Sequence, residues 1–285
     1  MKRLFTFALV VVMIAGALSC VFGDPVLLEY KFTKGELDKY RFAMNMNMQP
    51  AEGMGISAMN MSTSMVMKQK TIDVLPDGSG VIQLTISDIK LSGPIAQGNS
   101  IPSQTVKMTV SKNGKLISID SSGVNTGMPM DMSSLMNQTG QQAELPSSPI
   151  NIGDTWKSTI PMPFGGGSLT VLSTLIANGE KVWSQDAARI RQEFAGSMNL
   201  GQMLKGMTGA LPGVQAETLS GMAGSVDLTG SSELTFATSM GKMLKANNKT
   251  NAVIKIALPA SAVQNGAPSS IDMTMNMTMT VTRFK

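Results

Sequence analysis

The chain has 285 residues, of which 42% are hydrophobic and 15% are charged, and its formal net charge is +4. This length supports one large domain or two closely joined halves with a sizeable buried core. Two of the basic residues, Lys2 and Arg3, belong to an N-terminal leader, so the remaining chain is nearly neutral. Dispersed basic residues and only 5% aromatic residues exclude a nucleic-acid-binding protein, which needs a basic surface and stacking platforms.

Residues 1–23 have the layout of a secretory signal peptide, with two basic residues, an apolar run over 4–18 and then small residues. Val21 and Gly23 favour cleavage before Asp24, whereas the residues leading to Cys20 resemble a lipoprotein signal. We expect an exported protein in the periplasm or outside the cell, with lipidation of Cys20 as the alternative. No second apolar run is long enough for a transmembrane helix. Cys20 is the only cysteine, so an intramolecular disulfide is impossible.

Residues 24–120 are predicted to form a first β unit, with strands over 27–32, 40–49, 58–74, 81–91, 106–110 and 116–119. Strict alternation of apolar and polar residues is the signature of a strand with one buried face. The apolar phase shifts near 69–71 and again between Ile86 and Ile89, which indicates β-bulges. Turns are predicted at 76–80, at Asn113-Gly114 and, by their composition, in the polar loop 93–104.

Residues 121–149 are rich in Ser, Gly, Gln and Pro and are predicted to connect two units. One short helix is expected over 131–139, with Asp131 as its N-cap and Gly140 just past its end. Its apolar side would carry Met132, Leu135 and Met136. Residues 145–149 are expected to be a linker.

Residues 150–285 are predicted to form a second β unit that repeats the first. Gly153-Asp154 with Trp156 echoes Gly35-Glu36 with Tyr40, Asn178-Gly179 echoes Asp77-Gly78, and Met240-Gly241 echoes Asn113-Gly114. Strands are expected over 188–198, 226–237, 243–249 and 252–258. A helical insertion near 199–223 would carry Met203, Leu204 and Met207 on one side, in a helix weakened by glycines.

The last predicted strand, 271–284, shows the clearest pattern in the chain. Apolar residues occupy its odd positions from Ile271 to Val281, and Asp, Thr and Asn occupy its even positions. We expect this strand to pair in the sheet that holds the Met44 and Met61 strands, because their methionine faces need one another for burial. The predicted fold class is mainly β, with duplicated antiparallel units forming one large curved sheet, half-barrel or sandwich and two short helical flaps.

Catalytic chemistry is not predicted for this chain. The sequence contains no histidine, which excludes Ser-His-Asp and Cys-His catalysis and the usual exported zinc sites. The S-x-x-K spacing occurs from Ser87 to Lys90 and from Ser239 to Lys242, but it needs a helix to stack Ser on Lys, and here it falls in a strand and a turn. We therefore expect no enzyme, no catalytic residue and no cofactor.

The 26 methionines are the one anomaly of composition. Thioethers are soft ligands, so Cu(I) or Ag(I) binding is a weaker alternative for clusters such as Met44 to Met48. Methionine is also an adaptable filler of β interiors, and most strand methionines fall on the buried phase. We therefore predict no metal site.

The repeated strand and Gly-acidic-aromatic arrangement, followed by Leu145-Pro146, Pro149-Ile150 and Gly153-Asp154-Thr155-Trp156, resembles a family of uncharacterised bacterial exported or lipoprotein β-rich proteins. The resemblance implies a cell-envelope location and carries over no functional residue. Two functional classes stay open: a binding module for an apolar ligand such as a lipid or acyl chain, and a structural or interaction protein of the envelope. In the first class, the ligand contacts are predicted at Met132, Leu135, Met136, Met203, Leu204 and Met207.

Overall fold

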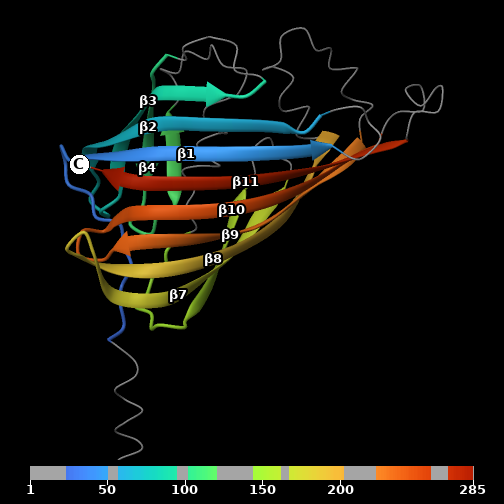
Figure 1. The fold of residues 1–285 in the computed structure, drawn as a ribbon. Helices are drawn as coiled ribbons and strands as arrows, with labels where there is room; N and C mark the ends of the chain where they lie inside the picture. Colours follow the sequence, from blue (N-terminus) through green and yellow to red (C-terminus); the bar gives the residue numbers. More distant parts are fainter. Residues whose placement is uncertain are drawn as a thin grey trace, which may run out of the picture.

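The structure is a computed structural model that describes residues 24–50, 57–94, 102–120, 144–161, 167–201, 223–257 and 269–284. Within these residues the protein is a single antiparallel sheet of 11 strands that does not close on itself (Figure 1). The mainly β prediction is confirmed, and the arrangement is one sheet rather than a sandwich of two. The strands are β1 Leu37–Pro50, β2 Met59–Val74, β3 Gly80–Ser92, β4 Gln104–Val110, β5 Leu116–Asp120, β6 Thr155–Pro161, β7 Ser168–Val182, β8 Gln185–Asn199, β9 Ala223–Ala237, β10 Lys242–Ala257 and β11 Ser270–Phe284.

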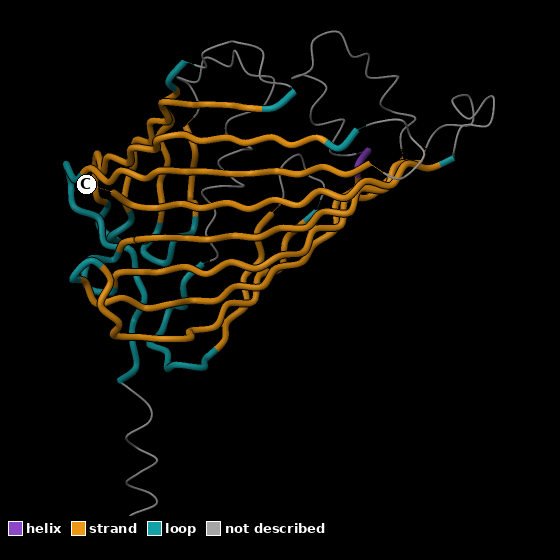
Figure 2. The backbone as a smooth tube through the Cα atoms, viewed as in Figure 1, coloured by secondary structure: helices purple, strands orange, loops and turns teal. Residues whose placement is uncertain are grey.

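The first and last strands of the chain lie side by side in the middle of the sheet. The strand order is β5-β4-β3-β2-β1-β11-β10-β9-β8-β7-β6, so the chain runs outward from β1 to one edge, crosses to the other edge and returns to β11. The predicted pairing of the C-terminal strand with the Met44 strand is confirmed in a continuous register from Lys39↔Phe284 to Pro50↔Met273. The sheet is strongly curved, and β4 lies behind β1 and β11 in the same view (Figure 2).

Period-two alternation gives the sheet an inner and an outer face. We define the inner face as the one that carries Tyr40, Phe42 and Val281, which are all buried. Register places Met67 and Met65 beside the two aromatic residues on that face. On their outer face, the central strands carry mainly Asn, Ser and Thr. Alternation therefore predicted correctly which side chains of these strands lie on the inner face.

Both predicted phase shifts correspond to irregular pairing between β2 and β3. The register shifts between Thr71 and Asp73, and again between Ser64 and Val66. The second shift faces Asp88, whose φ is 53°, as expected of a bulge residue. Residues 243–257 were predicted as two strands, but they form one strand, because Asn and Thr continue the alternation where apolar residues give way.

The Asn178-Gly179 pair does not form the hairpin turn that its likeness to Asp77-Gly78 indicated. It lies inside β7, where the register with β8 shifts between Ala177 and Glu180. The turn instead occupies Trp183 and Ser184, with φ values of 48° and 65°. Two successive residues with positive φ match the right-handed twist of the flanking strands, so strand twist decides the turn despite the unfavourable residue types.

The predicted first strand, 27–32, is wrong as a sheet strand. This segment is extended, but it crosses one end of the inner face and makes only an isolated bridge, Val26↔Ile150. Its backbone N–H groups reach two turns: Tyr30 N donates to Lys112 O at 2.7 Å and Lys31 N donates to Gly241 O at 3.2 Å. We call residues 24–35 the N-terminal strap. Its inward side chains alternate as in a strand, which is why sequence alone predicted one.

Glycines in the sheet and its turns make room for the strap. A Cβ on Gly114 would lie 2.8 Å from the Tyr30 ring, and one on Gly80 would lie 2.5 Å from the Phe32 ring. Gly114 also has a φ of 86°, which favours glycine over any other residue. The Asn113-Gly114 turn predicted from sequence is therefore confirmed, and it has a second role as a seat for Tyr30.

The turns that precede β1 and β6 share one geometry. Gly35 N donates to Thr71 O and Gly153 N donates to Leu175 O, both at 2.8 Å, and both glycines have positive φ. This likeness agrees with the predicted duplication, which stays a prediction. Residues 145–149 were expected to be a linker, but Leu145 is buried and its N–H donates to Asn113 O, because an apolar side chain there completes the core.

Several predicted features lie outside the described residues. They are the signal peptide 1–23 with Cys20, and the helix over 131–139. Of the predicted helical insertion near 199–223, Asn199 ends β8, Ala223 begins β9, Leu200 and Gly201 are helical, and 202–222 lie outside the described residues. No helix among the described residues is long and apolar enough to cross a membrane.

Candidate ligand-binding face

The inner face of the three central strands is surfaced by methionine. Met46 of β1 pairs with Met61 of β2 on one side and with Met277 of β11 on the other. Nine such methionines are partly exposed, and we call them the methionine face. Along β11 they extend from Met273 to Met279, or about 20 Å at about 3.4 Å per residue step. The methionine face consists of Met44, Met46, Met48, Met59, Met61, Met273, Met275, Met277 and Met279.

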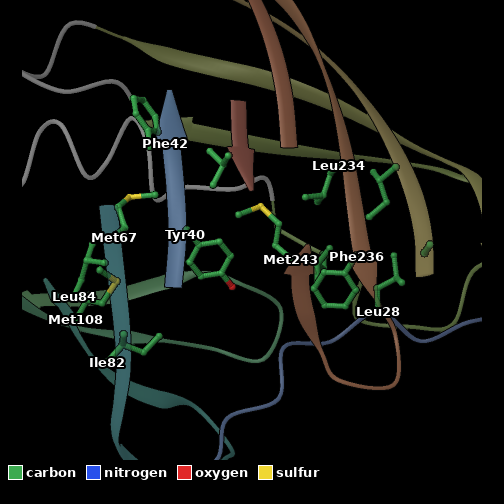
Figure 3. Close-up of a cluster of buried hydrophobic side chains, with 14 of the residues drawn as sticks. Leu28, Tyr40, Phe42, Met67, Ile82, Leu84, Met108, Leu234, Phe236 and Met243 are labelled. Atoms are coloured by element: carbon green, nitrogen blue, oxygen red, sulfur yellow. The ribbon is translucent and has the colours of Figure 1, made fainter. Parts of the chain in front are cut away.

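A filled core borders the methionine face at the end of the sheet where β1 begins. Tyr40 and Phe42 lie on neighbouring inward positions there, and Leu28 of the strap belongs to the same cluster (Figure 3). Tyr30 of the strap packs against this cluster as well. Tyr30 meets Phe236 edge to face, with ring centroids 5.2 Å apart. The strap thus closes this end of the inner face. Met44 and Met279 contact the core, and beyond them the methionine face begins.

Four charged side chains form a network at this closed end. Lys242 Nζ lies 3.0 Å from Asp38 Oδ2 and 3.0 Å from Glu36 Oε2, and Arg283 Nη2 lies 2.7 Å from Asp38 Oδ1. The side chains of Asp38 and Lys242 are only 5% and 7% exposed. Pairing at these distances compensates for the loss of water around them. Every one of these charges has a partner of opposite sign.

The two tyrosines beside this network are held neutral. Burial raises the pKa of Tyr30 and of Tyr40 well above the usual value of 10. The Asp38 carboxylate raises the pKa of Tyr40 further, because a nearby negative charge opposes a phenolate. Past the Asp38 network, the inward positions of the described strands carry no charged side chain.

A second apolar cluster lies on the inner face at the far ends of β8, β9 and β10. Its buried members are Met198, Leu200, Val226 and Ala252, and Met275 of the methionine face packs against it. Leu200, the first residue after β8, is 4% exposed. The chain therefore leaves β8 in contact with an apolar part of the inner face.

Uncharged polar residues separate the core from this second cluster. One cross-strand row runs from Asn248 through Ser232 and Gln192 to Ser173. Gln192 Nε2 donates to Ser173 Oγ at 3.3 Å, and Asn248 Oδ1 accepts from Thr250 Oγ1 at 2.8 Å. The four residues of this row are polar, although alternation places their side chains on the inner face. We call it the polar row.

Gln104 is the most unusual polar residue on the inner face. It is 5% exposed, and neither its Nε2 nor its Oε1 has a hydrogen-bond partner. Ser158 of β6 likewise has a buried hydroxyl without a partner. Sequence reasoning placed Gln104 in a loop, whereas it begins β4 and pairs with Ile86. Its inward phase with Val106 and Met108 was the signal that could have identified it.

The outer face opposite the methionines is polar. Asn47 Nδ2 donates to Asn60 Oδ1 at 2.6 Å, and Asn251 Nδ2 donates to Asn276 Oδ1 at 2.9 Å. Asn47 and Asn276 are themselves register partners, so four asparagines form a row across β2, β1, β11 and β10. A shallow depression of about 440 Å³ lies at three of them, Asn47, Asn60 and Asn276, and Met46 and Met61 also contribute to its lining.

The ligand contacts predicted from sequence, Met132, Leu135, Met136, Met203, Leu204 and Met207, all lie outside the described residues. The described ones bring together a different set, the strand methionines, which sequence reasoning assigned to the core. Among the described residues, no group of three or more His, Cys, Asp or Glu could hold a metal ion. The closely spaced acids Glu36 and Asp38 form ion pairs with Lys242 and Arg283.

No protein-family model matches this chain, and no curated protein matches it at a significant level.

Proposed function

We propose that this chain is an exported cell-envelope protein, without enzymatic activity, that binds an apolar ligand such as a lipid or an acyl chain. The observation that carries the proposal is the methionine face, nine partly exposed thioether side chains in register on three adjacent strands. Proteins seldom leave so many apolar side chains together and incompletely covered unless the surface binds something. The leader and the resemblance to envelope proteins support the location.

The size and softness of the methionine face suit a flexible chain. It is about 20 Å long on β11 and three strands wide, or about 10 Å from β2 to β11 at about 4.8 Å per strand spacing. Methionine side chains repack around varied shapes at little cost. Burying each methylene contributes about 0.8 kcal/mol, so about ten methylenes outweigh a binding cost that starts near 4 kcal/mol.

The test uses an uncharged fluorescent probe, Nile red, and residues 24–285 of the chain. Replacing Met46 by Glu places a charge in the middle of the methionine face and should weaken probe binding at least tenfold. Because Met46 is partly exposed, the melting temperature should change little. The matched control is Asn47→Glu, one residue away on the outer face, which should leave probe binding unchanged.

The two results separate the binding function from the structural alternative. If the wild-type chain binds no probe and Met46→Glu unfolds it, the methionines are core and the protein is a structural component of the envelope. Native mass spectrometry of protein purified from its own host provides a second measurement. A copurifying lipid supports the proposal, whereas bound Cu(I) or Ag(I) would favour the methionines as metal ligands.

A further inference from the structure

The Gln104 carboxamide carries hydrogen-bonding capacity that no residue in the described part of the chain uses. A carboxamide offers two N–H donors and one oxygen acceptor. Here the side chain is 5% exposed and both polar atoms lack a partner, whereas most buried polar side-chain atoms have at least one. A leucine or methionine at this inward position would fill the space without that cost. An unpaired, buried carboxamide is therefore best explained by a partner group on a ligand.

Gln104 lies where the filled core ends. It is the first residue of β4, and the next inward residues of that strand, Val106 and Met108, belong to the core. On the same cross-strand row lie Ile86 of β3 and then Met67 of β2. From this row β1 and β2 continue beyond the N-terminal end of β4 into the methionine face. A ligand that reaches Gln104 with one end can therefore lay the rest of its length on the methionines.

The surroundings of Gln104 favour an uncharged partner. Ile86, Met67 and Tyr40 follow it across the sheet, and the tyrosine is neutral because burial raises its pKa. The nearest charges on this face, Asp38 and Arg283, pair with each other. A charged headgroup would lose its water without gaining a counterion, which is costly in a buried site. A group with both donor and acceptor atoms matches a carboxamide without that cost.

We propose that the Gln104 carboxamide hydrogen-bonds the uncharged headgroup of an amphiphile, a hydroxyl or amide, while the amphiphile's chain lies on the methionine face. This inference rests on the proposed function and narrows its ligand class to nonionic lipids, such as acylglycerols and fatty amides. The polar row on β7 to β10 is consistent with it, because the other inward polar groups past the closed end are also uncharged.

The test compares three probes that each have an 18-carbon chain but differ at the head, each displacing Nile red: 1-monooleoylglycerol, oleate and 1-octadecene. The wild-type chain should bind monooleoylglycerol at least tenfold more tightly than oleate. Gln104→Met keeps the volume and removes the hydrogen bonds. It should weaken monooleoylglycerol binding about tenfold and leave octadecene unchanged, without lowering the melting temperature. The control Gln83→Leu changes an outer-face glutamine of the adjacent strand β3 and should alter none of the three.

Each other outcome has a definite meaning. Equal loss of all three probes in Gln104→Met, or no loss of any, overturns the inference and leaves the apolar-ligand function standing. Tighter binding of oleate than of monooleoylglycerol by the wild-type chain also overturns it. Failure of the wild-type chain to bind any probe removes the proposed function itself. Should Gln104→Met not fold, Gln104→Asn, which retracts the carboxamide by one methylene, must show the same selective loss.

Discussion

At the scale of single residues, the sequence predicted which side chains point inward but not which residues they contact there. Alternation placed Tyr40 and Val281 in the interior correctly, because strand geometry fixes the face of each residue. It could not show that the Met46 side chain stays partly exposed while Met67 is buried, since that depends on the strap and on β4, which cover one end only. Gln104 was missed for the same reason: its isolation follows from neighbours distant in sequence.

Asp38 is the residue on which the buried charge network depends. It contacts both Lys242 and Arg283 at the closed end, and without it Lys242 would keep only Glu36 as a partner. Replacing Asp38 by Asn should lower the free energy of unfolding by about 3–5 kcal/mol, the range seen when one partner of a buried pair is removed.

Urea denaturation measures this change. Asp272→Asn provides the control, because Asp272 is exposed on the outer face of β11 and exposed substitutions usually stay within about 0.5 kcal/mol. Equal effects of the two substitutions would show that the network contributes no stability.

The two tyrosines predict a loss of stability in alkali. Their pKa is raised in the folded protein above the value of 10 expected when unfolded, so stability is fully present below pH 10. Above it, only the unfolded chain ionises, and the free energy of unfolding should fall by about 1.4 kcal/mol per pH unit for each tyrosine.

Absorbance at 295 nm gives a direct check, because Tyr30 and Tyr40 are the only tyrosines in the chain. The phenolate signal should appear together with unfolding, as followed by circular dichroism, and not before it. A signal that rises near pH 10 while the chain is still folded would contradict the burial of both hydroxyls.

At the scale of elements, nearly every predicted strand is present, whereas the assignment of 27–32 to the sheet is wrong. A pattern of period two reports an extended segment with one apolar side, and the strap satisfies it as fully as a strand does. What the pattern lacks is the identity of the hydrogen-bond partner. For the strap those partners are turns and a bridge, at Lys112, Gly241 and Ile150.

The strap should therefore behave as part of the core. Leu28 is 1% exposed and Leu27 is 44% exposed, so the two neighbours form a matched pair. Leu28→Ala should lower the free energy of unfolding by about 2–5 kcal/mol, and Leu27→Ala by no more than about 0.5 kcal/mol. Thermal melts of both variants measure the difference. Similar losses for the two would mean that the strap does not close the inner face.

At the scale of the whole molecule, the sheet depends on its last strand. β11 pairs with β1 through 12 register positions and with β10 through 13, and among the described strands it joins the two halves of the sheet. Deleting residues 270–285 should therefore abolish cooperative unfolding, because β1 and β10 would each expose an edge in the middle of the sheet.

Circular dichroism during urea titration would detect the loss. Adding a peptide of residues 270–284 should restore a transition if the deletion removed only the missing strand, and a scrambled peptide of the same composition should not. A truncated chain that unfolds cooperatively near the native midpoint would show that one half of the sheet is stable alone.

The central position of β1 and β11 also determines when the protein can finish folding. All other neighbours in the sheet are successive strands, whose contacts close short loops and form early. The β1–β11 seam joins residues more than 200 positions apart, and it cannot form until β11 has been synthesised. Up to that moment β1 has an unpaired edge and its methionines have no β11 beside them. A chain that emerges N-terminus first is thus kept incomplete, and open to capture by other strands, until the 15 residues of β11 arrive.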